Sequence, residues 1–130
     1  MKKKTIKIQV SAGVGKYRID AEVICIGEDI LVSVWGGTKP HIGSVVISIP
    51  RKSLKDPNVI STTSSVFNCT GHKDEAIARL LSENIAAALN RLTIVTAGFH
   101  IDTINKNGLR SVSNNAKKLS FIILKKLGNR

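Results

Sequence analysis

The sequence is poor in aromatic residues and in cysteine, and it has no long hydrophobic run. Aromatic side chains make up 4% of its 130 residues, which disfavours a base-stacking surface for single-stranded nucleic acid. The two cysteines form no CxxC pair, so the sequence has no zinc-knuckle or dithiol motif. No apolar run approaches the ~20 residues of a membrane helix, and the lysine-rich start lacks the apolar segment of a signal peptide. We therefore expect a cytoplasmic protein without a membrane partner.

Acidic residues are also scarce, with 9 Asp and Glu against 20 Lys and Arg and a formal charge of +11. The basic excess gathers at the start of the chain and in its last third. Such a field attracts nucleic acid, a phosphorylated cofactor or an acidic protein surface without choosing among them. Nucleic acid stays an allowed but disfavoured partner, because a charge run more often forms a solvated lysine-rich surface.

Motifs of common enzyme classes are missing as well. The sequence contains no GxSxG, P-loop or GxGxxG pattern. Cys69 lies three residues from His72, but a Cys–His pair also needs an orienting third group and an oxyanion hole. The sequence therefore gives little support to nucleophilic catalysis.

The residues that are present predict one α+β domain spanning residues 1–130. Aliphatic side chains dominate an apolar content of 42%, which is enough for a packed core at this length. Alternating or continuous apolar patterns predict strands, and a 3.6-residue period predicts helices. The expected order is β-β-β-β-β-α-β-α, an antiparallel sheet of about six strands with two helices on one face. The expected strands cover 5–11, 17–26, 30–35, 44–49, 59–67 and 92–97, and the expected helices cover 73–91 and a segment that starts between 102 and 111 and ends at 128.

All three histidines lie in glycine-containing junctions between these elements. The junctions are Pro40-His41-Ile42-Gly43, Gly71-His72-Lys73-Asp74-Glu75 and Gly98-Phe99-His100-Ile101-Asp102. Loops held by a scaffold are common places for binding groups. If the junctions meet at one end of the sheet, they bring together three imidazoles, one lysine and several carboxylates.

Three interpretations of these junctions remain open. Three neutral imidazoles can hold a catalytic zinc ion, although the spacing matches no metal motif. The backbone N–H groups of Gly36, Gly37 and Gly71, with a helix starting near His72, can form a pocket for phosphate or carboxylate. Alternatively, the histidines and glycines only complete turns and cap helices.

The same junctions, read together with Gly36-Gly37-Thr38-Lys39 and Thr96-Ala97, resemble the prenylated-flavin chaperone or LpdD-like family. This family contains the small D subunit of bacterial gallate decarboxylase systems and is likened to proteasome assembly chaperones. The resemblance runs from about Ala21 to Leu127. It does not include the basic start of the chain or the lysine-rich character of its last helix.

The resemblance implies a non-enzymatic accessory protein, a homodimer that assists a UbiD-type decarboxylase by handling prenylated flavin mononucleotide. A chaperone that binds only protein is the alternative, and a metal-dependent enzyme using the three histidines is a further one. The positions that the resemblance and the anion-pocket interpretation assign to cofactor binding are Gly36, Gly37, Pro40, His41, Gly43, Gly71, His72, Lys73, Asp74, Glu75, Gly98, His100 and Asp102.

Overall fold

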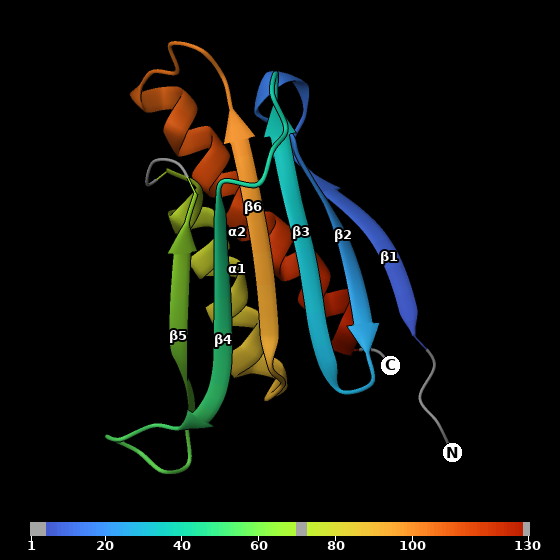
Figure 1. Ribbon diagram of the computed structural model, residues 1–130, viewed down its shortest axis with the longest axis vertical. Helices are drawn as coiled ribbons and strands as arrows, with labels where there is room; N and C mark the ends of the chain where they lie inside the picture. Colours follow the sequence, from blue (N-terminus) through green and yellow to red (C-terminus); the bar gives the residue numbers. More distant parts are fainter. Residues whose placement is uncertain (1–4, 70–72, 129–130) are drawn as a thin grey trace.

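A computed structural model of the chain, which describes residues 5–69 and 73–128, shows a six-stranded sheet with both helices packed on one face (Figure 1). The strand order across the sheet is β1-β2-β3-β6-β4-β5. The strands are β1 (Ile6–Ala12), β2 (Ile19–Ile26), β3 (Asp29–Gly37), β4 (Ser44–Lys52), β5 (Ile60–Asn68) and β6 (Thr93–His100); a short 3-10 turn η1 (Gly15–Tyr17) joins β1 to β2, and the helices are α1 (Lys73–Leu89) and α2 (Lys106–Gly128).

The predicted α+β class and element order are confirmed, and the sheet is mixed rather than fully antiparallel. Strand β6 enters the sheet between β3 and β4, pairing parallel with β3 and antiparallel with β4. All other described pairs are antiparallel. The chain reaches β6 through α1, and this crossover allows a parallel pair that two-residue turns cannot make. The sequence predicted each strand but not this insertion.

The core lies between the two helices and one face of the sheet. From the sheet, Val23, Val32 and Val95 have no exposed surface. Opposite them, the predicted stripe of α2 is buried throughout, as Val112, Ala116, Leu119, Ile123 and Leu127. The α1 stripe is buried at Ile77, Leu81 and Ile85 and half-buried at Leu80 and Leu89, whereas Ala88 is exposed. Burial of these aliphatic side chains, at about 1.5–3 kcal/mol each, fixes both helices on the sheet.

Element ends differ from the prediction where a strand continues through glycine or proline. Gly36 and Gly37, assigned to a loop, are the last residues of β3 and pair with Phe99 and His100 of β6. Pro50 lies inside β4 rather than ending it. Beyond Ser48, β4 pairs only with β5, and a strand that is open on one side tolerates the missing N–H of proline.

The start of α2 is capped by Asn105 rather than by Asp102 or Thr103, whose side chains are also of types that can cap a helix. The Asn105 side-chain oxygen accepts a hydrogen bond of 2.8 Å from the backbone N–H of Gly108. Asparagine is a favoured N-cap residue because its side chain satisfies an otherwise unpaired helical N–H. Thr70, which by its residue type could cap the start of α1, lies outside the described residues. Neither described helix is long and apolar enough to cross a membrane.

Candidate functional site

The predicted junctions at 40–43 and 98–102 meet at one end of the sheet. The first turn of α1, which belongs to the predicted junction at 71–75, lies at the same end. The β3–β4 loop (38–43) runs back along the end of β6 (Figure 1). The Thr38 N–H donates to the His100 carbonyl (2.8 Å), and the Gly43 N–H donates to the Ala97 carbonyl (2.9 Å). The Cys69 N–H then donates to the Gly43 carbonyl (2.8 Å). The loop is therefore fixed by backbone hydrogen bonds to β6 and to Cys69, the residue that follows β5.

Asp74 joins these segments through both oxygens of its carboxylate. Its Oδ2 lies 3.0 Å from Nε2 of His41, and its Oδ1 accepts a 2.9 Å hydrogen bond from the backbone N–H of Phe99. The residue is only 5% exposed and is the second residue of α1. A carboxylate at this position is favoured by the positive end of the helix dipole. The predicted site residues His41 and Asp74 are thus in direct contact.

His41 has an oxygen partner at each ring nitrogen. Its Nδ1 lies 2.9 Å from the Lys39 carbonyl oxygen, while its Nε2 faces Asp74. Neither nitrogen is free in this arrangement to bind a metal ion or to take a proton from a substrate. The ring instead holds the β3–β4 loop against the start of α1.

Two predicted glycines let the loop lie this close to β6. A side chain on Gly98 would collide with the backbone carbonyl of His41. Gly37 has a φ of +79° and would place a side chain against the carbonyl of His100. Both positions therefore need glycine for backbone packing, which supports the structural interpretation of these two residues.

The third predicted junction places His100 beside Asp102. Nε2 of His100 lies 2.7 Å from Oδ1 of Asp102, and both side chains are exposed to solvent. The hydrogen bond from His100, followed by the charge of Lys39, lowers the pKa of the Asp102 carboxyl below its ordinary value. His41 and His100 are thus bonded to different carboxylates.

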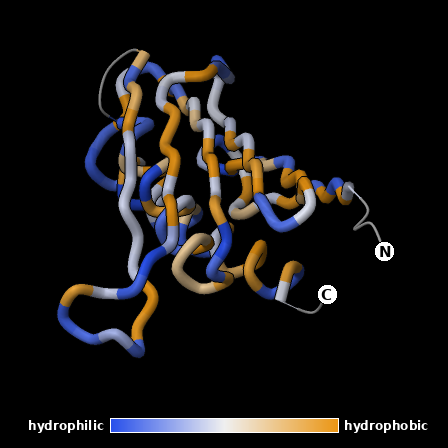
Figure 2. Tube along the Cα trace, turned by 60° about the horizontal axis from the view of Figure 1, so that its bottom comes forward, coloured by the Kyte–Doolittle hydropathy of each residue, from blue (hydrophilic) through white to orange (hydrophobic). Residues whose placement is uncertain are grey.

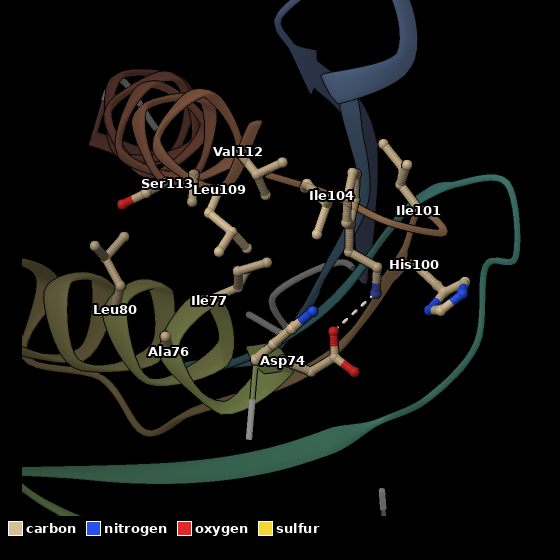
Figure 3. Close-up of a pocket in the computed structure, with 13 residues that line it drawn as sticks. Asp74, Ala76, Ile77, Leu80, His100, Ile101, Ile104, Leu109, Val112 and Ser113 are labelled. Carbon is tan, nitrogen blue, oxygen red and sulfur yellow. Dashed lines mark hydrogen bonds between the residues drawn. The ribbon is translucent and has the colours of Figure 1, made fainter. Parts of the chain in front are cut away.

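A pocket of about 310 Å³ opens between α1, α2 and the end of β6. Figure 3 shows Ile77, Leu80, Leu109 and Val112 around this opening, with the His100 imidazole directed away from it. Among the described residues that line the pocket, Lys73 is the one lysine or arginine. The full lining is Lys73, Asp74, Ala76, Ile77, Leu80, Phe99, His100, Ile101, Ile104, Leu109, Val112, Ser113 and Ala116.

The remaining predicted residues lie at the same end of the molecule but line other hollows. His41 lines a hollow with Trp35 and Ile42 on the helix-free face of the sheet. Gly36, Gly37 and Pro40 line a neighbouring hollow with Lys16 and Arg18. The sheet thus lies between these hollows and the pocket that Lys73, Asp74 and His100 line.

Glu75 and Gly43 have structural contacts, and two predicted residues cannot be placed. Oε1 of Glu75 accepts a 2.7 Å hydrogen bond from Asn68, and Oε2 pairs with Arg79 at 3.1 Å. A side chain on Gly43 would meet the Asp74 carboxylate. Gly71 and His72 lie outside the described residues. Within the described ranges 5–69 and 73–128, no group of three or more His, Cys, Asp or Glu side chains is placed to hold a metal ion.

Sequence reasoning did not find the apolar lining of the pocket. The apolar periods of the two helices assigned their lining residues to the core: Ile77, Leu80 and Val112. The period alone does not show that these residues also line a pocket at one end of the helix pair. Leu109, one turn before Val112, is 41% exposed. The signal that the sequence offered was Leu109 itself, an apolar residue that continues the stripe of α2 toward the junction before the helix.

Comparison with known proteins identifies the domain. A family described as "Prenylated flavin chaperone LpdD-like domain" matches residues 13–128. Protein LpdD of Lactiplantibacillus plantarum is 31% identical over 90 residues, which cover 69% of this chain and 62% of that protein. The aligned part thus spans less than two thirds of the relative's length.

A solved structure shows the same fold. A chain from the crystal structure of a novel chaperone complex for yeast 20S proteasome assembly superposes with a TM-score of 0.60, covering 96% of each chain at 14% sequence identity. At this identity the likeness concerns the arrangement of strands and helices.

Proposed function

The chain belongs to the prenylated flavin chaperone LpdD-like family, and we propose that it holds prenylated flavin mononucleotide for a UbiD-type decarboxylase without itself catalysing a reaction. Family membership makes the domain a chaperone domain. The cofactor, the decarboxylase and the absence of catalysis are the proposed parts. The observation that carries the proposal is the apolar pocket between α1 and α2, with Lys73 among its lining residues.

The pocket suits one part of such a cofactor. A prenylated flavin combines a flat ring system, apolar at its dimethylbenzene and prenyl-derived rings and polar at its pyrimidine edge, with a ribityl chain that ends in a phosphate. A volume of about 310 Å³ is at the lower end of the range for ligand pockets. We expect the ring system to enter between Ile77, Leu80 and Leu109, leaving the phosphate outside near Lys73. A lysine ammonium pairs readily with a phosphate.

The described polar residues beside the pocket support a holding role rather than catalysis. His41 and Asp74 satisfy one another, and Asp74 also binds the Phe99 N–H. His100 is directed away from the pocket opening (Figure 3) and pairs with Asp102. The described carboxylate and imidazoles beside the pocket are therefore held by other partners, and the remaining titratable group of the described lining, Lys73, is the one we assign to the phosphate rather than to general acid–base catalysis.

Native mass spectrometry tests the proposal directly. The purified protein is mixed separately with prenylated flavin mononucleotide, with ordinary flavin mononucleotide and with riboflavin. We expect one prenylated cofactor to bind per chain, more tightly than the ordinary nucleotide, and riboflavin to bind more weakly than either phosphorylated flavin. No uptake of the prenylated cofactor would overturn the proposal.

A second function is favoured by one separate observation. The sheet face opposite the helices carries several exposed apolar side chains, among them Ile49 and Phe67, which fits a chaperone that binds only protein. A chain that takes up no flavin but still binds a decarboxylase subunit would favour this second function over the first.

A further inference from the structure

The helix pair has a second hollow on its outer side. Both helices lie behind the sheet in Figure 1, so each has a side that faces away from it. There a hollow of about 550 Å³ opens between α1 and α2. Its lining residues are mostly apolar or small, and none of them is acidic: Asn84, Ala87, Ala88, Lys117, Ser120, Phe121 and Leu124.

Phe121 is an exposed aromatic side chain between cations. A single exposed apolar residue needs no explanation, but Phe121 is 69% exposed and borders this hollow together with the half-buried Leu124. Lys117 and Lys125 lie four residues before and after it, and Lys118 lies three before it. Residues three and four apart are neighbours on a helix surface, so Phe121 has a lysine on each side. Figure 2 shows hydrophobic and hydrophilic residues alternating along the last turns of α2, beside the C-terminus.

The outer side of the helix pair is positively charged. Helix α2 has six basic residues and no acidic one in its sequence KNGLRSVSNNAKKLSFIILKKLG. On α1, Glu83 accepts a 2.7 Å hydrogen bond from Ser64, and Glu75 accepts one of 2.7 Å from Asn68. Both partners belong to β5, and the remaining acid of α1, Asp74, is held by the end of β6. The acidic groups of α1 are thus engaged away from the hollow.

The shape and charge of this groove fit an amphipathic helix with acidic flanks. A hydrophobic groove takes the apolar face of a helix through side chains spaced three, four and seven residues apart. Arg110 lies eleven residues before Phe121, about three turns along the same side of α2. From Arg110 to Lys125 the helix rises by about 22 Å, which matches about four turns of a partner helix. Its Asp and Glu side chains would meet the cations of α2.

Other polyanions fit the groove less well. A membrane surface is flat and needs no hollow. Binding of single-stranded nucleic acid depends on several aromatic side chains that stack on successive bases, and Phe121 is the one aromatic residue in the described sequence of α2. The combination of a hollow, an apolar lining and flanking cations therefore favours a protein helix.

We propose that the outer groove between α1 and α2 binds an acidic amphipathic helix of a partner protein. Leu80 and Ser113 line the pocket described above, and Asn84 and Lys117, about one turn further along each helix, line the groove. The bound helix would therefore lie beside the pocket. The inference goes beyond the proposed function, because it depends only on the helix pair and holds whether or not the chain binds a flavin.

A designed peptide provides the probe. It is a fluorescein-labelled helix of about 18 residues with leucine at every third or fourth position and glutamate on both flanks. A scrambled peptide of the same composition keeps the charge but has no apolar face. Fluorescence anisotropy at about 0.15 M salt measures the binding of each peptide to the purified protein. We expect the designed helix to bind at least about tenfold more tightly than the scrambled peptide.

A matched pair of phenylalanine variants locates the binding. Phe121 on α2 is 69% exposed and Phe67 on β5 is 70% exposed, so Phe121→Ala and Phe67→Ala remove the same side chain from different faces. Phe121→Ala should raise the dissociation constant of the designed helix at least about tenfold, whereas Phe67→Ala should leave it unchanged. Thermal unfolding shows whether each variant is folded. The opposite result would place the binding on the sheet and overturn the proposal.

A matched pair of charge variants separates the groove from the net charge of the chain. Lys117→Glu combined with Lys125→Glu should weaken the designed helix at least about tenfold. Lys52→Glu combined with Lys55→Glu makes the same change of net charge at the end of β4 and in the β4–β5 loop, and it should have little effect. Equal weakening by both would show that only the overall charge of +11 attracts the peptide, and would overturn the proposal.

Two further probes test the other partner classes. Vesicles of phosphatidylcholine containing about a quarter phosphatidylserine represent an anionic membrane, and a single-stranded RNA represents nucleic acid. Both should bind more weakly than the designed helix and be insensitive to Phe121→Ala. Tighter binding of either probe that is lost in Phe121→Ala would assign the groove to that partner and overturn the proposal, as would a designed helix that does not bind the wild type.

Discussion

Nε2 of His41 lies 3.0 Å from Oδ2 of Asp74, although 33 residues separate them in the sequence. Through the other oxygen of Asp74, which binds the Phe99 N–H, the same carboxylate also holds the end of β6. The β3–β4 loop, the first turn of α1 and the end of β6 are therefore tied to one buried side chain. This contact sets the shape of the end of the molecule where the pocket opens.

Removing this carboxylate should destabilise the protein. In Asp74→Ala, the half-buried Phe99 loses the acceptor of its backbone N–H and the more exposed His41 ring loses its partner, and leaving a buried polar group unsatisfied costs about 1–3 kcal/mol. We expect the free energy of unfolding in urea to fall by roughly 2 kcal/mol or more. Asp29→Ala, at an exposed strand end, should change it by less than about 0.5 kcal/mol. Equal stability of the two variants would show that the Asp74 contacts contribute little.

Pocket substitutions should weaken flavin binding in two different ways. Leu109→Glu introduces a charge into the apolar lining, so it should weaken the binding of prenylated flavin mononucleotide and riboflavin alike. Lys73→Ala removes a cation near the opening, so it should weaken only the phosphorylated flavins, by about tenfold for a loss of 1.4 kcal/mol. Fluorescence titration of the flavin measures each affinity.

Leu54→Glu is the matched control for the pocket variants. Leu54 is 91% exposed and lies in the β4–β5 loop, at the opposite end of the sheet (Figure 1). Its affinity for every flavin should equal that of the wild type. If Leu109→Glu also binds like the wild type, while thermal unfolding shows that it is folded, the cofactor does not use this pocket.

The Asp102 carboxyl should titrate at a lower pH than an ordinary aspartate. Its pKa is lowered first by the hydrogen bond from His100 and then by the charge of Lys39. Because the folded-state pKa is the lower one, the stabilising effect is present above the ordinary pKa and is lost as the pH falls through the folded value. Carbon NMR titration should find that His100→Ala raises the Asp102 pKa more than Lys39→Ala does. No change in either variant would contradict this assignment.

A methyl group at Gly98 should disturb the loop that crosses β6. In Gly98→Ala, the new side chain meets the His41 backbone carbonyl. A backbone atom cannot move aside as the end of a flexible side chain can, so the clash is not easily relieved. Overpacking of this kind costs about 1–3 kcal/mol, and thermal unfolding should show a lower midpoint. Gly128→Ala, where no atom lies within 4 Å of the added carbon, should leave the midpoint nearly unchanged. If both variants unfold alike, the loop can move away at little cost.

Local patterns in the sequence were sufficient for the secondary structure and the fold class. The alternation in Thr5–Ser11 and the stripe of Val112, Ala116 and Leu119 each follow the period of their element, and the structure contains both elements. The glycine and histidine junctions were also visible, and their motifs carried the resemblance to the family that the comparisons found. Errors concentrated at element ends, as at Pro50, because strand ends depend on which neighbour still pairs.

The sequence by itself determined the element order, the helix stripes, the family and the junctions where a site was expected, because these depend on neighbours along the chain. Only the tertiary structure decided that β6 enters between β3 and β4, and that Asp74 reaches both His41 and the end of β6. It also decided that the sheet lies between the His41 hollow and the pocket of Lys73, and that one apolar face stays uncovered. Periodicity assigns a residue to a face, but it contains no information on which faces meet, since that depends on contacts between distant segments.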